Sequence, residues 1–152
     1  MNIASFDFAD NGEIPRQFTC QGDNASPSIE INDVPAGAQS LALICDDPDA
    51  ATDPNGPGHT FDHWVVYNIP PHMTSFGPGA VPTGAQEGLN SSGQYGYTGP
   101  CPPTGEHTYT FRAYALDTEL QLNDEADKGA VIDAMQGHVI EQAQMTGRYQ
   151  KQ

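Results

Sequence analysis

The chain has 152 residues, of which 20 are Asp or Glu and only 5 are Lys or Arg, so its formal net charge is -15. A chain of this length fits one domain and can bury about 70% of its unfolded surface. The charge argues against nucleic acid as a partner, because so acidic a protein repels phosphate backbones. We expect a single domain, 1–152, with no nucleic-acid partner.

The carboxylates are spread along the whole sequence, which indicates an acidic surface on a folded body rather than an acidic tail. At about 1 M salt the Debye length falls to roughly 3 Å, so repulsion among these charges is largely screened. The composition therefore favours a halophilic protein from a haloarchaeon. With no basic, apolar leader and no run of about 18 apolar residues, we expect a cytoplasmic protein and no integral membrane segment.

The cysteines Cys20, Cys45 and Cys101 are odd in number, far apart and without a C-x-x-C pair. This pattern argues against a zinc site and a disulfide framework, and it predicts a protein of a reducing compartment. Cys101 stands between two prolines near His107, where a loop or packing role is favoured over a reactive thiol.

The many Gly and Pro residues favour short strands joined by turns, so the fold class we expect is mainly β. Residues 2–8 predict an edge strand, and the alternation of 28–31 predicts a half-buried strand. The apolar runs 40–45 and 63–69 predict strands that are covered on both faces.

Residues 108–116 alternate cleanly and predict a strand that carries His107, Tyr109 and Phe111 on one face. Residues 70–105 hold much of the Gly and Pro and predict a long, packed loop.

Near the end of the chain, an i, i+3, i+4, i+7 pattern runs from Val131 to His138 and predicts a helix. Asp127 or Asp124 can cap its N-terminus. We expect helical turns to continue through 139–145 and to stop at Gly147.

Two stiff loops each deliver a histidine, His63 and His107, to the start of an apolar strand, and Asp47 follows the 40–45 strand. If these strands are neighbours, the three groups share one rim, which is a typical form of small-ligand site. A carboxylate beside an imidazole keeps its proton available, so two such donors and the Tyr109 hydroxyl suit a phosphate or carboxylate oxygen. Alternation places His63 on the side of Val65.

Each of these residues also has a structural interpretation. Asp47 precedes a proline and can simply cap a turn, His63 can donate to a backbone carbonyl, and Tyr109 can be a half-buried strand aromatic.

Metal binding and catalysis find less support. A group of acids and histidines could bind a metal, but its order matches no EF-hand and there is no H-E-x-x-H: Asp47, Asp49, Asp53, His59 and His63. The chain also lacks G-x-S-x-G, a Walker loop and a complete dinucleotide fingerprint. We therefore expect no metal, no cofactor and no enzymatic activity, and a hydrolase that uses His107 or Cys101 ranks last.

Two motifs resemble the signature regions of the phosphatidylethanolamine-binding proteins, and the match is closest to the bacterial and archaeal Raf kinase inhibitor-like branch. They are Asp47-Pro48-Asp49-Ala50 with His63-Trp64-Val65-Val66-Tyr67-Asn68, and Gly99-Pro100-Cys101-Pro102-Pro103 with Gly105-x-His107-x-Tyr109. The resemblance extends over nearly the whole chain. It implies a β-sandwich-like fold with a few peripheral helices near the C-terminus and a small anion pocket.

The resemblance also assigns the pocket residues. Asp47 lines the pocket, His63 and His107 donate to a phosphate-like oxygen, Tyr109 adds its hydroxyl, and Gly99 and Pro100 form the loop wall. Relatives bind phospholipid head groups or other small anions without a general cofactor. The alternative that the resemblance leaves open is a protein-interaction module that inhibits a protease or kinase through its rim loops, and prokaryotic relatives suggest a homodimer.

The chain departs from the family pattern at two places. Thr108 stands where Arg is common, which removes a charge from the outward side of the strand. Ala51 replaces a usual proline, and the stretch from Thr52 to His59 loosens the approach to His63. We expect this stretch to make the pocket rim more flexible than in relatives.

Overall fold

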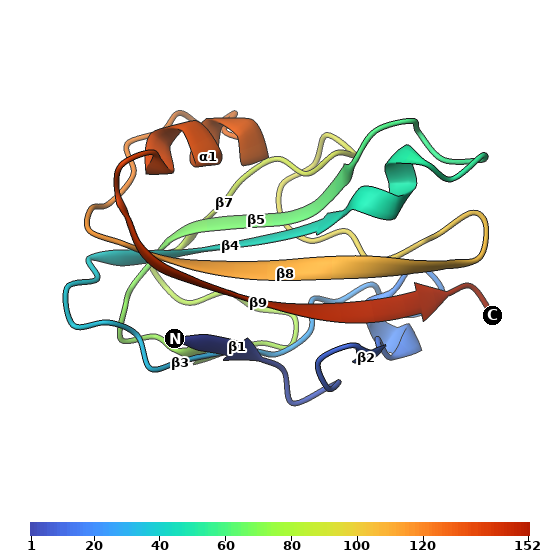
Figure 1. The fold of residues 1–152 in the computed structure, drawn as a ribbon, viewed down its shortest axis with the longest axis horizontal. Helices are drawn as coiled ribbons and strands as arrows, with labels where there is room; N and C mark the ends of the chain where they lie inside the picture. The colour runs from blue at the N-terminus through green and yellow to red at the C-terminus, as the bar shows by residue number, and fades with distance from the viewer.

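The computed structural model describes residues 1–152, and most of its regular secondary structure is strand, which confirms the mainly β class. A six-stranded sheet has the order β2-β9-β8-β4-β5-β7, and a three-stranded sheet has the order β1-β3-β6. The small sheet lies against one face of the large sheet, and α1 covers the other face (Figure 1). The result is a layered sandwich with a single peripheral α-helix.

The elements follow one another in this order along the chain: β1 (Asn2–Ala4), β2 (Gly12–Glu13), the 3-10 helix η1 (Arg16–Phe18), β3 (Ile29–Asn32), β4 (Ser40–Asp47), the 3-10 helix η2 (Pro48–Ala51), β5 (Phe61–Ile69), β6 (Ser75–Phe76), β7 (Gln86–Glu87), β8 (Glu106–Leu116), α1 (Lys128–Met135) and β9 (Val139–Gln150).

The core has two parts because the large sheet is covered on both faces. Trp64, Phe111 and Tyr149 pack toward the small sheet, whereas Ile44 and Val65 pack toward α1. The central strand β4 is buried at every position, which explains the continuous apolar run of its residues 41–45. The alternation predicted for β8 is confirmed, because Tyr109 and Phe111 belong to the part of the core on the side of the small sheet and Leu116 belongs to the part on the side of α1.

The helix predicted near the C-terminus is present as α1, and its N-cap is Asp127, whose carboxylate accepts a 3.0 Å hydrogen bond from Ala130 N. The predicted helical continuation through 139–145 is wrong. This segment belongs to β9, which pairs antiparallel with β8. Its first half is almost entirely exposed, and its apolar residues Val139, Ile140 and Ala143 do not alternate with polar ones, so it shows no period-2 apolar signal.

Gly147 lies inside β9 and does not end a helix. A Cβ at this position would lie 2.6 Å from a side-chain carbon of Ile14, so glycine lets the side chain of Ile14 pack directly on the strand.

A disulfide joins Cys20 to Cys101, and Cys45 is the one free thiol, buried in the core. The prediction that the cysteines form no disulfide is therefore wrong. The two half-cystines are 81 residues apart in sequence, and only the folded chain brings their loops together. The cysteine pattern consequently no longer supports a reducing compartment.

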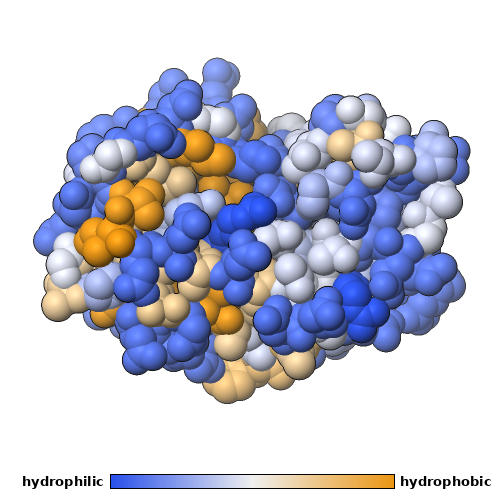
Figure 2. Space-filling model, viewed as in Figure 1, coloured by the Kyte–Doolittle hydropathy of each residue, from blue (hydrophilic) through white to orange (hydrophobic).

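The predicted loop 70–105 contains the two short strands β6 and β7, which extend the small and the large sheet. No helix in the structure combines the length and hydrophobicity needed to cross a bilayer. On the face shown in Figure 2, the apolar surface gathers toward the left, whereas the right end is mainly blue and white. The right end is where η2 lies and β8 begins (Figure 1).

Candidate functional site

Three strand ends meet at one edge of the large sheet. Asp47 is the last residue of β4, His63 lies near the start of β5, and His107 lies near the start of β8. Because β4 pairs antiparallel with both β5 and β8, the end of β4 adjoins the beginnings of its two neighbours. The predicted sharing of one rim is confirmed.

A β-bulge determines where His63 points. The register pairs Cys45 with Trp64 and Asp46 with Asp62, which leaves His63 without a partner on β4. Strict alternation had placed His63 on the side of Val65, which packs toward α1. The bulge instead turns His63 to the opposite face, beside Tyr109, so that part of the prediction is wrong.

His107 lies between two carboxylates. Its Nδ1 is 2.6 Å from Asp47 Oδ2, and its Nε2 is 2.8 Å from Asp53 Oδ2. Burial lowers the pKa of His107, but the hydrogen bonds and charges of the two carboxylates outweigh it, so the pKa lies above its ordinary value. The geometry therefore favours a protonated ring that donates from both nitrogens.

Asp53 is the carboxylate that faces Nε2, and it also ties two loops together. Its Oδ1 accepts from Asn55 N at 2.9 Å, and its Oδ2 accepts from Thr104 N at 3.1 Å. The Asn55 amide donates in turn to Thr104 Oγ1 at 2.6 Å. The backbone N–H of Asn55, with His107 and Thr104, lowers the pKa of Asp53. The stretch expected to be flexible is thus joined to the loop before β8.

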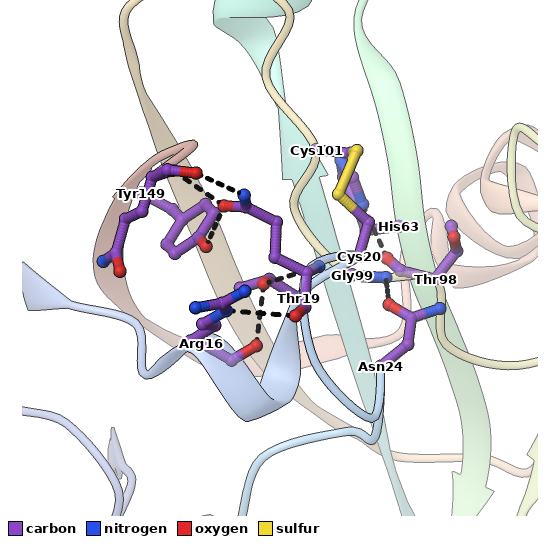
Figure 3. The surroundings of a disulfide bond; sticks show 11 residues. Arg16, Thr19, Cys20, Asn24, His63, Thr98, Gly99, Cys101 and Tyr149 are labelled. Carbon is purple, nitrogen blue, oxygen red and sulfur yellow. Dashed lines mark hydrogen bonds between the residues drawn. A yellow bond between two sulfur atoms is a disulfide. The ribbon is translucent and has the colours of Figure 1, made fainter.

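His63 is in a different electrostatic state. Its Nδ1 is 2.6 Å from the carbonyl oxygen of Thr98, so this nitrogen must carry the proton and donate (Figure 3). Burial lowers the pKa of His63, and the bond to Thr98 with the nearby Asp47 only partly offsets it. The neutral ring then presents a lone pair at Nε2.

Tyr109 is almost fully buried, with 1% of its surface exposed, and its hydroxyl has no hydrogen-bond partner. It lies between the two histidines, with ring centroids 5.1 Å from His63 and 6.4 Å from His107. Burial and the charge of Asp47 raise the pKa of Tyr109, so its hydroxyl stays protonated. A buried donor without a partner is rare and suggests a group supplied from outside.

These residues surround a cavity of about 230 Å³. Its polar side chains are Asp47, His63, His107 and Tyr109, and the rest of its lining is Ala50, Pro57, Phe61, Thr98, Gly99, Cys101, Pro102 and Pro103. A small polar floor with an apolar mouth is the usual form of a small-ligand site.

The structure brings five of the six predicted site residues to the cavity, and Pro100 is the exception. The carbonyl of Pro100 instead accepts from Cys20 N at 3.1 Å. Gly99 lines the wall and donates from its N–H to Asn24 Oδ1 at 2.8 Å. A Cβ on Gly99 would lie 2.4 Å from the carbonyl oxygen of Phe18, so only glycine fits there.

The disulfide belongs to the same wall. It joins the loop after η1 to the loop that runs from Thr98 past Gly99 (Figure 3). The Thr98 carbonyl that orients His63 and the Cys101 side chain that lines the cavity are therefore on one short, cross-linked segment.

Sequence reasoning missed the part that Asp53 plays and considered it only as a metal ligand. Its one local signal is the spacing Asp53-x-Asn55, which is typical of an Asx turn. The structure has no group of three His, Cys, Asp or Glu residues positioned to hold a metal ion. Asp47 and Asp53 instead contact opposite nitrogens of one imidazole.

Comparison with known proteins places this architecture in a family. The family model for phosphatidylethanolamine-binding protein matches residues 4–150. A UPF0098 protein from Methanothermobacter thermautotrophicus is 47% identical, over 99% of this chain and 99% of the relative. A UPF0098 protein from Chlamydia pneumoniae is 42% identical, again over 99% of both chains.

Two crystal structures agree. A putative phosphatidylethanolamine-binding protein homologue from Chlamydia trachomatis superposes with a TM-score of 0.93 at 38% identity, and covers 99% of this chain and 97% of its own. YbcL of E. coli, described as a member of the mammalian family, gives a TM-score of 0.88 at 29% identity, with 99% and 98% covered.

The relatives named above lend no support to the haloarchaeal origin inferred from charge. They support the family, its bacterial and archaeal branch, and its fold. The chain belongs to the phosphatidylethanolamine-binding protein family.

Proposed function

We propose that this chain binds a small oxyanion, such as phosphate or the phosphate of a phospholipid head group, at the edge of the sheet and without catalysis. The observation that carries the proposal is the Asp53 carboxylate, held 2.8 Å from His107 Nε2. A carboxylate from the chain itself already takes the hydrogen bond that an external oxyanion would need. The subsite is thus chemically suited to an oxygen anion.

The remaining polar groups support an oxyanion that keeps one proton. Tyr109 offers a buried hydroxyl with no partner, and His107 can offer Nε2–H once the Asp53 carboxylate that now accepts from it is displaced. Neutral His63 offers an acceptor, because its Nδ1 proton is taken by Thr98. A singly protonated phosphate has oxygens for both donors and a P–OH for the acceptor, so all three groups are matched.

Binding of this kind works against the overall charge of -15. Long-range attraction is therefore absent, and affinity depends on short hydrogen bonds in a site that excludes water. Pro57, Phe61 and Pro103 make the mouth apolar and suit the carbon atoms that follow the phosphate in a head group.

Calorimetric titration with phosphate and with phosphoethanolamine tests the proposal. Tyr109→Phe removes the unpartnered hydroxyl and should weaken binding about tenfold, the worth of one hydrogen bond to a charged ligand. Tyr95→Phe is the matched control, since the Tyr95 hydroxyl donates to the Asp124 carbonyl outside the cavity. This variant should bind like the wild type.

Absence of binding to either ligand at millimolar concentration would contradict the proposal. Equal affinity of Tyr109→Phe and the wild type would show that phosphate binds elsewhere. A difference between phosphate and phosphoethanolamine would show whether the apolar mouth contributes.

A further inference from the structure

Asp53 contacts the one ring nitrogen of His107 that Asp47 leaves free. One ring nitrogen of His107 is bound by Asp47, so Nε2 is the only donor that the ring has left, and Asp53 accepts from it. The Asp53 side chain is 1% exposed although it belongs to a surface loop. As long as this contact persists, His107 has no free N–H to offer.

The contact is held by a short, polar tether. Asp53 follows η2, where its N–H donates to the Asp49 carbonyl at 3.0 Å, and its other anchors are Asn55 and Thr104. The Asn55–Thr104 hydrogen bond is exposed. Gly58 follows with a φ of +84° and no atom within 4 Å of a Cβ placed there. A loop held by exposed polar contacts opens at a small free-energy cost.

We propose that Asp53 is a tethered competitor: its carboxylate occupies the anion position at His107 Nε2, and an external oxyanion binds only when the loop Thr52–His59 releases it. This inference rests on the proposed function. It makes Asp53 the residue that sets the affinity of the site, because a ligand must outcompete a group already in place.

The size of the effect follows from the tether. A group on a short flexible linker has an effective concentration in the millimolar range. An external anion is disfavoured about tenfold when this concentration is about ten times the dissociation constant of an untethered carboxylate at the same site. Asp53 also adds one negative charge near the site, and the repulsion between this charge and an external anion lowers the affinity further.

The test compares phosphate affinity in the whole chain by calorimetry. Asp53→Ala removes the acceptor and should bind phosphate about tenfold more tightly than the wild type, and Asp53→Asn, whose neutral amide oxygen can still accept from Nε2 more weakly, should gain less. Asp49→Asn is the matched control, since it removes one charge from the same segment while its side-chain oxygen can still accept from Thr108 N. This variant should change the affinity less than threefold.

The outcomes separate the two claims. If the Asp53 variants bind phosphate no more tightly than the wild type, the proposal that Asp53 competes with the ligand is overturned, and the proposed function still stands. If Asp49→Asn gains as much phosphate affinity as the Asp53 variants, the effect is due to charge alone, and the proposal that Asp53 competes with the ligand is also overturned. Absence of binding in every protein overturns both claims.

A second measurement needs no variant. In the wild type, phosphate should release Asp53, so the amide proton of Thr104, on the other loop, loses its acceptor and exchanges faster with solvent. Unchanged exchange of the Thr104 amide at saturating phosphate would overturn the proposal.

Discussion

His63 and Thr98 are joined by a 2.6 Å hydrogen bond in which the ring Nδ1 donates to the backbone carbonyl. This bond fixes the tautomer and leaves Nε2 as an acceptor. His107, 6.4 Å from the ring of Tyr109 on its other side, is instead held by two carboxylates. The pKa values of the two histidines of one pocket are therefore shifted in opposite directions.

The first prediction concerns their titration. The pKa of His107 should lie above the ordinary value of about 6.5, and that of His63 below it, because carboxylates dominate at the first and burial at the second. Asp53→Asn should lower the pKa of His107 toward the ordinary value. Histidine NMR across pH measures the pKa values of His107 and His63 in the wild type and that of His107 in Asp53→Asn. Equal pKa values for the two rings of the wild type would contradict the prediction.

The second prediction concerns stability. His107→Gln removes the cation beside Asp47, which is only 3% exposed, and should lower the free energy of unfolding by about 3 kcal/mol. The folded-state pKa of His107 is raised, so its contribution is complete below about pH 6.5 and is lost as the pH rises through that raised value. The deficit should therefore shrink in alkaline buffer.

Urea unfolding at several pH values measures this deficit. His59→Gln provides the control, because His59 is exposed and contacts only the carbonyl of Thr60. It should change stability by less than about 0.5 kcal/mol. A deficit in His107→Gln that grows with pH would show that the ring is neutral in the folded state.

The third prediction separates stability from binding at Tyr109. Its hydroxyl is buried without a partner, and such a group costs about 1 to 3 kcal/mol. Tyr109→Phe should therefore unfold at the same or a higher urea concentration than the wild type while it binds phosphate less tightly. Destabilisation by more than about 1 kcal/mol would mean that the hydroxyl has a partner in the folded protein.

The fourth prediction concerns the disulfide. The Cys20–Cys101 bond closes a long loop, with a sequence separation of 81, and should contribute about 2 to 4 kcal/mol. Reduction should lower the midpoint of unfolding in the wild type. A Cys20→Ser, Cys101→Ser double variant should start lower and show no further change with reductant. Equal midpoints for the oxidised and reduced wild type would contradict the prediction.

Much of the fold was predictable because several elements carry strong local patterns. β4 contains a continuous apolar run, and the residues of β8 alternate between the two faces of the sheet. Both patterns predict strands, and the structure has strands at both places. β9 was not predictable, because residues 139–144 are almost all exposed, their polar and apolar side chains do not alternate, and their strand is set by pairing with β8. The pairing of Cys20 with Cys101 likewise depends on the tertiary fold alone.

The candidate site shows the same division. Asp47, His63 and His107 follow from motifs at strand ends, and strand pairing brings them together. The face of the sheet to which the His63 side chain points depends on a β-bulge, and no residue pattern in the sequence predicts this bulge. The contact of Asp53 with His107 joins a loop to the start of β8, 54 residues further along the chain. A contact between residues so far apart in sequence cannot be predicted from local sequence patterns.

Side-chain NMR of the two histidines during a phosphate titration tests the central claim most directly. We predict that the ring nitrogen signals of both His63 and His107 shift and saturate together with phosphate, while those of exposed His59 stay unchanged. Signals of His63 and His107 that do not move at millimolar phosphate would contradict an oxyanion site at this edge of the sheet.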